Sequence, residues 1–305
     1  MSREDHTPRP EPPRRRSGQR ASRRMTIAAG VPASSASVAA AADAALVLEE
    51  GVARFDGGDL DGAITAWTQA VGIDPTLADA WFDLGTAYAK IRDFDEAVRC
   101  YRAAIELEPN VHQAWYNLGF ACAERGDRVA AAEAYRRAAE IGAGDYRTWY
   151  NLGNAYLDLG RSGDAVSAYR TALDHNDGDD EVWNNLGNAL VQLERSDEAD
   201  RCFRRALELN PAYDLGWNNL GNVLEESGAW TEAQQAYEKA VELVPDNATY
   251  RLNLASALAR VGQADRAVEQ LARAVKLAPA VRSLLPGFAE FAPLLDHSRL
   301  LADDN

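Results

Sequence analysis

One hexapeptide recurs along this chain at a fixed interval of 34 residues. The sequence WNNLGN stands at 183–188 and again at 217–222, and close variants begin at Trp81, Trp115 and Trp149. A chain that repeats itself at such a period stacks similar units side by side and does not build one globular core. The period therefore constrains the fold more strongly than the length of 305 residues, which alone would suggest about two domains.

Seven repeats follow one another without an insertion, at residues 44–77, 78–111, 112–145, 146–179, 180–213, 214–247 and 248–281. Trp, Leu and Gly recur at positions 4, 7 and 8 of the repeat, and this spacing is one face of an α-helix. A second helical face has Ala at positions 20 and 27 and a bulky residue at position 24. Five repeats have Pro at position 32, where a helix must end. Each repeat is therefore predicted to be two antiparallel helices.

This pattern resembles the tetratricopeptide repeat (TPR) family, whose motif is W-x2-L-G-x2-Y, then A-x3-F, then P. The resemblance covers 44–281 and implies an all-α fold, a right-handed superhelical solenoid of antiparallel helix pairs with buried Trp residues at position 4. Repeats 1 and 7 depart from the motif, because Val47 and Arg251 replace that Trp. Residues 282–305 include an amphipathic stretch around Phe291, which predicts a capping helix over repeat 7 followed by a tail.

Charge is distributed unevenly along the chain. The net charge is −15, but residues 1–43 hold eight of the 32 basic residues and four of the 47 acidic ones, so they carry about +4 and the remainder about −19. We expect no nucleic-acid ligand, since so acidic a body does not attract phosphate backbones. Residues 1–43 are predicted to be a disordered basic tail. We hypothesise that residues 1–24 bind the acidic repeats of the same or a neighbouring molecule.

The tail also bears on localisation. Ser22-Arg23-Arg24 precedes a mildly apolar stretch, which loosely resembles a twin-arginine export signal. A disordered tail, or a translation start at Met25, explains the same residues equally well. We expect a cytoplasmic protein, with export as the open alternative, and the excess of Arg over Lys suggests a bacterial source with a GC-rich genome. No run of eighteen apolar residues predicts a membrane span.

The residue types that carry catalysis or bind metals form no motif in this sequence. The His residues are isolated and the Cys residues lack CxxC spacing: His6, His112, His175, His297, Cys100, Cys122 and Cys202. No glycine-rich phosphate loop and no GxSxG turn is present. We therefore predict that the protein is not an enzyme and binds no cofactor or metal, and that its thiols are reduced and packed as small hydrophobic groups.

Asparagine recurs on the side of the first helix that is opposite the packing face. Positions 2, 6, 9 and 13 fall together there, because each residue turns the helix by about 100°. Position 6 is Asp83 in repeat 2 and Asn in every later repeat, and position 9 is Asn in repeats 4 to 6. At an exposed site Asn costs up to about 0.7 kcal/mol of helix stability relative to Ala, so solubility alone does not explain these rows.

In the TPR family this face lines a concave groove, and an amide can match both hydrogen-bonding groups of any peptide unit. We therefore predict a protein-interaction scaffold that holds an extended peptide segment. Acidic residues at position 13, such as Glu124, Asp158 and Glu226, favour a neutral-to-basic ligand. The predicted peptide-binding residues are Asn117, Asn151, Asn154, Asn185, Asn188, Asn219, Asn222, Tyr116 and Tyr150.

Three alternatives stay open at this point. The amides could bond only to the neighbouring repeat or to water. The chain could be the targeting or regulatory subunit of a separate enzyme, for example a glycosyltransferase or a protease. If it is exported, it could be an envelope-assembly factor.

Overall fold

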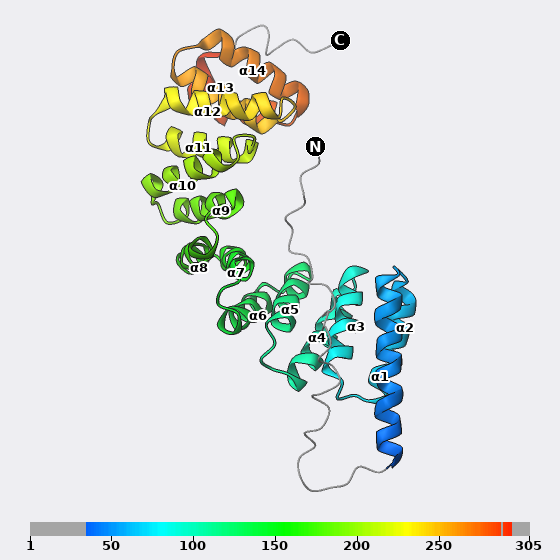
Figure 1. Ribbon diagram of the computed structural model, residues 1–305. Coiled ribbons are helices and arrows are strands. Elements are labelled where there is room, and N and C mark those ends of the chain that lie inside the picture. Colours follow the sequence, from blue (N-terminus) through cyan, green and yellow to red (C-terminus); the bar gives the residue numbers. More distant parts are fainter. Residues whose placement is uncertain (1–34, 288, 295–305) are drawn as a thin grey trace. The chain divides into compact units, whose positions relative to one another are not determined.

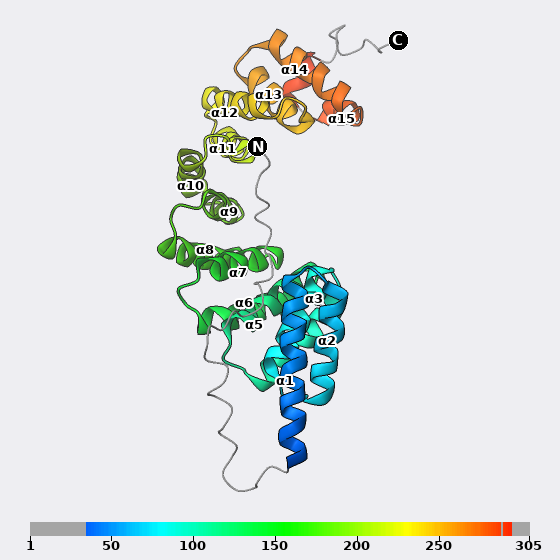
Figure 2. The same ribbon diagram turned by 45° about the vertical axis from the view of Figure 1, so that its right-hand side comes forward.

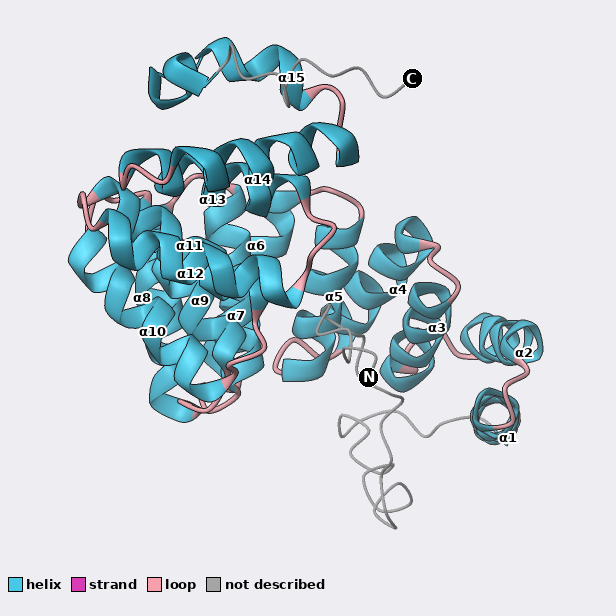
Figure 3. Cartoon of the chain, turned by 90° about the horizontal axis from the view of Figure 1, so that it is seen from above, coloured by secondary structure: helices cyan, strands magenta, loops and turns pink. Residues whose placement is uncertain are grey.

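The computed structural model describes residues 35–287 and 289–294, and in that part of the chain all regular structure is helical (Figures 1 and 3). The chain divides into two units, Met1–Gly160 and Arg161–Asn305, which we call the N-terminal unit and the C-terminal unit. The prediction of an all-α fold made of tandem helix pairs is confirmed. The export motif, Met25 and most of the basic tail lie outside the described residues.

The N-terminal unit contains three helical hairpins and the first helix of a fourth (Figure 2). Its helices are α1 (Ser35–Asp56), α2 (Leu60–Ile73), α3 (Ala78–Lys90), α4 (Phe94–Leu107), α5 (His112–Glu124), α6 (Arg128–Ile141) and α7 (Tyr146–Asp158). Helix α1 begins within the predicted disordered tail, so residues 35–43 are helical and that part of the prediction is wrong. The physical reason is that most of this stretch is Ala, the strongest helix former.

The C-terminal unit continues with the second helix of repeat 4 and three more hairpins. Its longer helices are α8 (Ser162–His175), α9 (Asp180–Val191), α10 (Ser196–Leu209), α11 (Asp214–Glu226), α12 (Trp230–Leu243), α13 (Ala248–Arg260) and α14 (Ala264–Leu277). In both units, each first helix from repeat 2 onward begins at the first residue of its repeat, and each second helix begins at position 17.

The turn inside each hairpin places one residue, at position 15, in the left-handed region of the backbone. Five repeats use Gly there, while Arg92 and Glu194 adopt φ values of 64° and 59°. The next amide then bonds back to the end of the first helix, as the Asp93 N–H does to the Tyr88 carbonyl at 2.9 Å. This closure reverses the chain and brings the second helix against the first.

The core of each hairpin is the bulky side chain at position 24 of the second helix. These side chains are at most 1% exposed: Trp67, Tyr101, Tyr135, Tyr169, Phe203, Tyr237 and Leu271. In repeats 5 and 6 the ring faces the position-8 Gly of the first helix. A Cβ added at Gly187 would lie 2.5 Å from the Phe203 ring, and one at Gly221 would lie 2.4 Å from the Tyr237 ring. Glycine is therefore required here because the two helices approach so closely.

The Trp residues at position 4 are not the buried core that the family resemblance implied. All five are only partly buried: Trp81, Trp115, Trp149, Trp183 and Trp217. Each indole N–H donates to the carbonyl at position 32 of the preceding repeat, for example from Trp183 to Asp177 at 2.8 Å and from Trp217 to Pro211 at 2.9 Å. The indole needs this partner because its N–H is a donor that burial would otherwise leave unsatisfied. Position 4 therefore fixes the loop between two repeats.

Repeat 7 keeps this hydrogen bond without a tryptophan. Arg251 is 7% exposed, and its Nε donates to the Pro245 carbonyl at 2.8 Å. A second guanidinium nitrogen donates to Gln270 Oε1 at 2.6 Å, and burial lowers the pKa of Arg251 from its ordinary value. Arg251 therefore departs from the motif in residue type but keeps the hydrogen bond to the position-32 carbonyl that the indole N–H makes in other repeats.

Three short helical segments cover the end of repeat 7 in place of the single capping helix that was predicted. They are α15 (Val281–Leu284), η1 (Leu285–Gly287) and η2 (Ala289–Leu294). The helix is interrupted because Pro286 has no N–H to donate. Glu290 in η2 accepts hydrogen bonds from Ser256 Oγ at 2.7 Å and from Arg260 at 3.2 Å, while Phe291 is fully buried. The segment therefore caps the array despite its irregular backbone.

Candidate functional site

In the C-terminal unit, the position-6 amides of α11 and α13 link each of these helices to the first helix of the preceding repeat. Asn219 Nδ2 on α11 donates to Asn184 Oδ1 at 2.9 Å and to Asn188 Oδ1 at 3.2 Å, both on α9. Asn184 Nδ2 in turn donates to Asn185 Oδ1 at 3.2 Å. The amides thus form a ladder that runs from helix to helix across the stack.

The same two bonds recur one repeat later. Asn253 Nδ2 on α13 donates to Asn218 Oδ1 at 2.8 Å and to Asn222 Oδ1 at 3.4 Å. The sequence prediction placed Asn253 in the position-6 row without including it in the site, and it missed Asn184 and Asn218 as members of this network. The signal was present, since the two adjacent Asn residues of WNNLGN occupy positions 5 and 6, and both are used.

The rows at positions 6 and 9 differ in what they can still offer to a ligand. Asn219 and Asn253 use their N–H groups between repeats, whereas Asn188 and Asn222 use their carbonyl oxygens as acceptors. Among the described residues, the Nδ2 groups of Asn188 and Asn222 have no protein acceptor. Asn222 is exposed, and Asn185, Asn188 and Asn219 are half-buried. Position 9 therefore presents N–H donors and position 6 presents carbonyl acceptors.

In the N-terminal unit, three of the predicted site residues are buried. Asn117, Tyr116 and Asn151 are 0%, 3% and 4% exposed. Asn151 Nδ2 donates to the Tyr116 hydroxyl at 3.1 Å, and Asn117 shares a side-chain hydrogen bond with Tyr101. Side chains this deeply buried present almost no surface to a ligand, so here the geometry favours the alternative in which the amides join neighbouring repeats. Asn154 and Tyr150 are half-buried.

The position-9 row also provides partners for the tyrosines of the core. Tyr101 donates to Thr86 Oγ1 at 3.3 Å, and Tyr237 donates to Asn222 Oδ1 and to Glu225 Oε2, both at 2.8 Å. Burial, with the Glu225 carboxylate nearby, raises the pKa of Tyr237, so its hydroxyl stays a donor. Position 9 of repeat 3 is Phe120, and the buried Tyr135 hydroxyl accordingly has no hydrogen-bond partner.

Replacing Tyr135 with Phe is therefore expected to raise the free energy of unfolding by about 1 kcal/mol, because it removes an unsatisfied buried hydroxyl. Tyr237→Phe is the matched control and should lower the free energy of unfolding by about 1 kcal/mol, since it breaks two hydrogen bonds. Urea denaturation followed by circular dichroism measures both. Equal destabilisation by the two substitutions would contradict this account.

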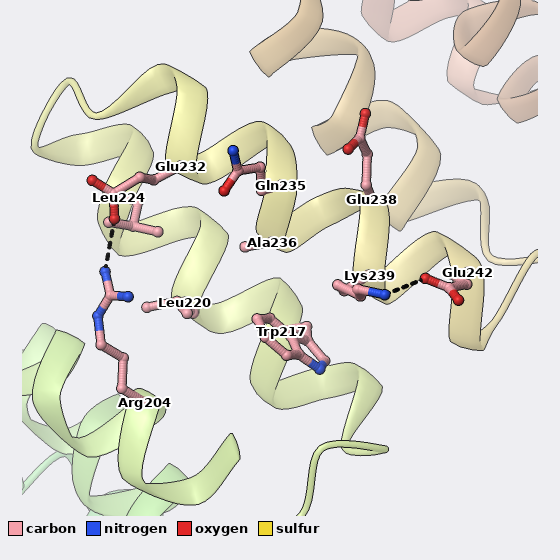
Figure 4. Close-up of a pocket in the computed structure, with 10 residues that line it drawn as sticks. All are labelled: Arg204, Trp217, Leu220, Leu224, Glu232, Gln235, Ala236, Glu238, Lys239 and Glu242. Carbon is pink, nitrogen blue, oxygen red and sulfur yellow. Dashed lines mark hydrogen bonds and ion pairs between the residues drawn. The ribbon is translucent and has the colours of Figure 1, made fainter. Parts of the chain in front are cut away.

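The structure also contains a pocket that the sequence did not predict. It lies in the C-terminal unit, between α10, α11 and α12, beside the partly buried Trp217 (Figure 4). Leu220 and Leu224 line it with Trp217, and Arg204 and Glu232 stand at its edge. No sequence pattern predicted this pocket, because Trp217 was expected to be buried.

The described residues hold no group of three His, Cys, Asp or Glu side chains that could bind a metal ion. Within the same ranges, no helix has the length and apolar character needed to cross a membrane. Cys100, Cys122 and Cys202 are buried and form no disulfide. Burial raises the pKa of Cys100 to about 12 and that of Cys202 to about 11, so both thiols are protonated at neutral pH.

Family models match most of the chain. The model described as the C-terminal domain of cilia and flagella-associated protein 70, a TPR domain, matches residues 77–284, and a TPR repeat model matches residues 51–91. No curated protein matches the sequence.

Several solved structures have a similar fold. The crystal structure of the MamA protein is 26% identical, with a TM-score of 0.54, over 55% of this chain and 92% of that one. YrrB, described as a TPR protein with an unusual peptide-binding site, is 21% identical over 61% and 95%, with a TM-score of 0.56. The C-terminal part of a TPR repeat-containing protein from Cytophaga hutchinsonii is 16% identical over 79% and 99%, with a TM-score of 0.65.

Proposed function

We propose that the C-terminal unit of this chain holds an extended peptide segment of a protein partner. The chain belongs to the tetratricopeptide repeat family represented by those two models, and the proposal proceeds from that membership. The fold is that of a protein–protein interaction scaffold. The observation that carries the finer proposal is the alternation of unused N–H donors at position 9 with carbonyl acceptors at position 6.

This alternation suits a peptide main chain. Each peptide unit carries one N–H and one C=O, and an extended segment leaves both available for bonding. Asn188 and Asn222 can donate to carbonyl oxygens of the ligand, while Asn219 and Asn253 can accept from its N–H groups. Because main-chain groups are the same in every residue, such rows bind a segment with little regard to its side chains.

The ladder also holds the binding groups in place before the ligand arrives. The Asn188 and Asn222 side chains are fixed by hydrogen bonds from the next repeat, at 3.2 and 3.4 Å. Ordering a free side chain on binding costs about 0.5–1.5 kcal/mol, and a side chain that is already ordered avoids most of this cost. The structural bonds between repeats therefore favour ligand binding and do not compete with it.

The expected ligand is neutral to basic. Glu226 is exposed at the end of α11, and the repeats as a whole are strongly acidic. The structure of YrrB is described as having a peptide-binding site, but at 21% identity that likeness concerns the fold alone. The proposal rests on the amide rows of this chain.

Replacing Asn188 and Asn222 together with Ala is expected to weaken peptide binding by about tenfold, because two hydrogen-bond donors are lost. The probe is a neutral twelve-residue peptide selected on the full chain from a random display library, and calorimetry measures its affinity. Asn222→Asp is a sharper variant. It keeps an oxygen for Tyr237 and Asn253 but cannot donate, so it should also weaken the binding of a neutral peptide.

Asn219→Ala serves as the comparison because it removes the two hydrogen bonds between α11 and α9. We expect it to lower the free energy of unfolding by about 1–2 kcal/mol. The position-9 pair should lower it by a similar amount, because it removes the acceptors for Asn219, Asn253 and Tyr237, so the comparison concerns peptide affinity at matched stability. Peptide affinity that is unchanged when both position-9 donors are absent would refute the proposed site.

A further inference from the structure

A second surface of the C-terminal unit has the features of a binding site. The pocket between α10, α11 and α12 has a volume of about 470 Å³, and Trp217, Leu220 and Leu224 line its α11 side (Figure 4). An adjoining pocket of about 340 Å³ shares Arg204, Leu224 and Glu232 with it. The two hollows are therefore neighbours on one surface, and we call them together the α11 groove.

The apolar wall of the α11 groove is available because of how the indole is held. The Trp217 N–H donates to the Pro211 carbonyl at 2.9 Å, so the ring is anchored at one edge and remains partly exposed. Ala236 of α12 lines the same pocket with a short side chain. An anchored aromatic ring beside aliphatic side chains is the usual lining of a ligand pocket.

The rim of the α11 groove is charged, with more carboxylates than cations. Glu232 and Glu242 are 59% and 67% exposed, and they pair with Arg204 at 3.1 Å and with Lys239 at 2.7 Å. Glu238 adds a third carboxylate, which pairs with Arg266 at 2.7 Å. Exposed pairs of this kind contribute little to stability, so a cation of a ligand can take the place of Arg204 or Lys239.

We propose that the α11 groove binds residues 7–16 of this same protein, TPRPEPPRRR. Four of these ten residues are Pro, which favours the extended polyproline II conformation. Polyproline II segments dock on grooves lined by aromatic rings, and the preformed helix loses little entropy on binding. Arg14, Arg15 and Arg16 follow the prolines and match the carboxylates of the rim in charge.

The amide rows are a poor site for the same segment. Proline has no N–H, so much of this segment cannot donate to the carbonyl oxygens of Asn219 and Asn253. A groove lined by Trp217 and leucines requires no such donor. The two surfaces therefore suit different ligands. A Pro-rich segment suits the α11 groove, and a segment with free N–H groups suits the amide rows.

The test titrates a labelled peptide of residues 7–16 into the full chain at low ionic strength, with fluorescence anisotropy as the readout. The receiving chain carries Ala at Pro8, Pro10, Pro12 and Pro13, so that its own segment does not compete. We expect saturable one-to-one binding that Glu232→Lys with Glu242→Lys weakens by about tenfold. A peptide with Ala in place of the four Pro residues should bind about fivefold more weakly. The unaltered chain should bind the peptide less well than the Ala-substituted chain.

The matched control is Glu140→Lys with Glu208→Lys, which makes the same change in charge at exposed residues outside the groove. Equal weakening by the control pair would overturn the inference, because it would indicate general charge attraction. Tight binding of the proline-free peptide, or the absence of saturable binding, would overturn it as well. A loss of binding of the 7–16 peptide in the Asn188→Ala, Asn222→Ala variant would also overturn the inference. The library peptide tests the amide rows separately, so either proposal can fail alone.

Discussion

Replacing Phe203 with Ala is expected to lower the free energy of unfolding by about 3–5 kcal/mol, the usual loss when a fully buried aromatic ring is removed from a core. Phe203 is 1% exposed and packs directly over Gly187 of the facing helix. The hairpin cannot close over the space that the ring leaves, because its two helices are held by a tight turn at Glu194. The cavity term therefore adds to the loss of apolar burial.

Trp183→Phe is the informative comparison in the same hairpin. The Trp183 side chain is only partly buried. Phe retains an aromatic ring at this position but cannot make the indole hydrogen bond to the Asp177 carbonyl. We expect a loss of about 1 kcal/mol, measured with Phe203→Ala by urea denaturation. A larger loss at Trp183 than at Phe203 would indicate that the repeated tryptophan is the core residue and would contradict the assignment of the core to position 24.

Replacing Gly187 with Ala is expected to destabilise the protein by about 1–3 kcal/mol, although Ala is the better helix former by about 1 kcal/mol. The new Cβ would lie 2.5 Å from the Phe203 ring, which is closer than carbon atoms can approach. Either the ring or the helix must then shift. Gly163→Ala in α8 provides the opposite case, since a Cβ there meets nothing within 4 Å, and it should raise stability by about 0.5–1 kcal/mol.

A second substitution shows whether the Phe203 ring is the cause. Phe203→Leu shortens the side chain that faces Gly187, so it should cost less in the Gly187→Ala background than in the unaltered protein. Residues in contact typically couple by about 0.5–3 kcal/mol, which a double-mutant cycle measures. Additive effects of the two substitutions would show that the clash lies elsewhere.

The two rows of amides illustrate how far sequence reasoning could go at the candidate site. The helical period correctly placed Asn188, Asn219 and Asn222 on one side of the first helices, because side-chain direction follows directly from the turn per residue. It could not separate partly exposed amides from buried ones. Asn117 and Asn151 occupy the same repeat position as Asn219, yet they are buried, while Asn219 keeps part of its surface exposed. Their neighbours in adjacent repeats make the difference.

Local chemistry in the chain was enough to define the hairpins, since helix periodicity, glycine turns and proline stops act over a few residues. It was also enough to find where each repeat begins. Whether a given side chain is buried depends on side chains about one repeat away, and no local pattern predicts these contacts. Phe120 leaves the Tyr135 hydroxyl unsatisfied, Arg251 takes over the bond of an indole, and Trp217 keeps one face open to a groove. These outcomes depend on which residues meet when the hairpins stack.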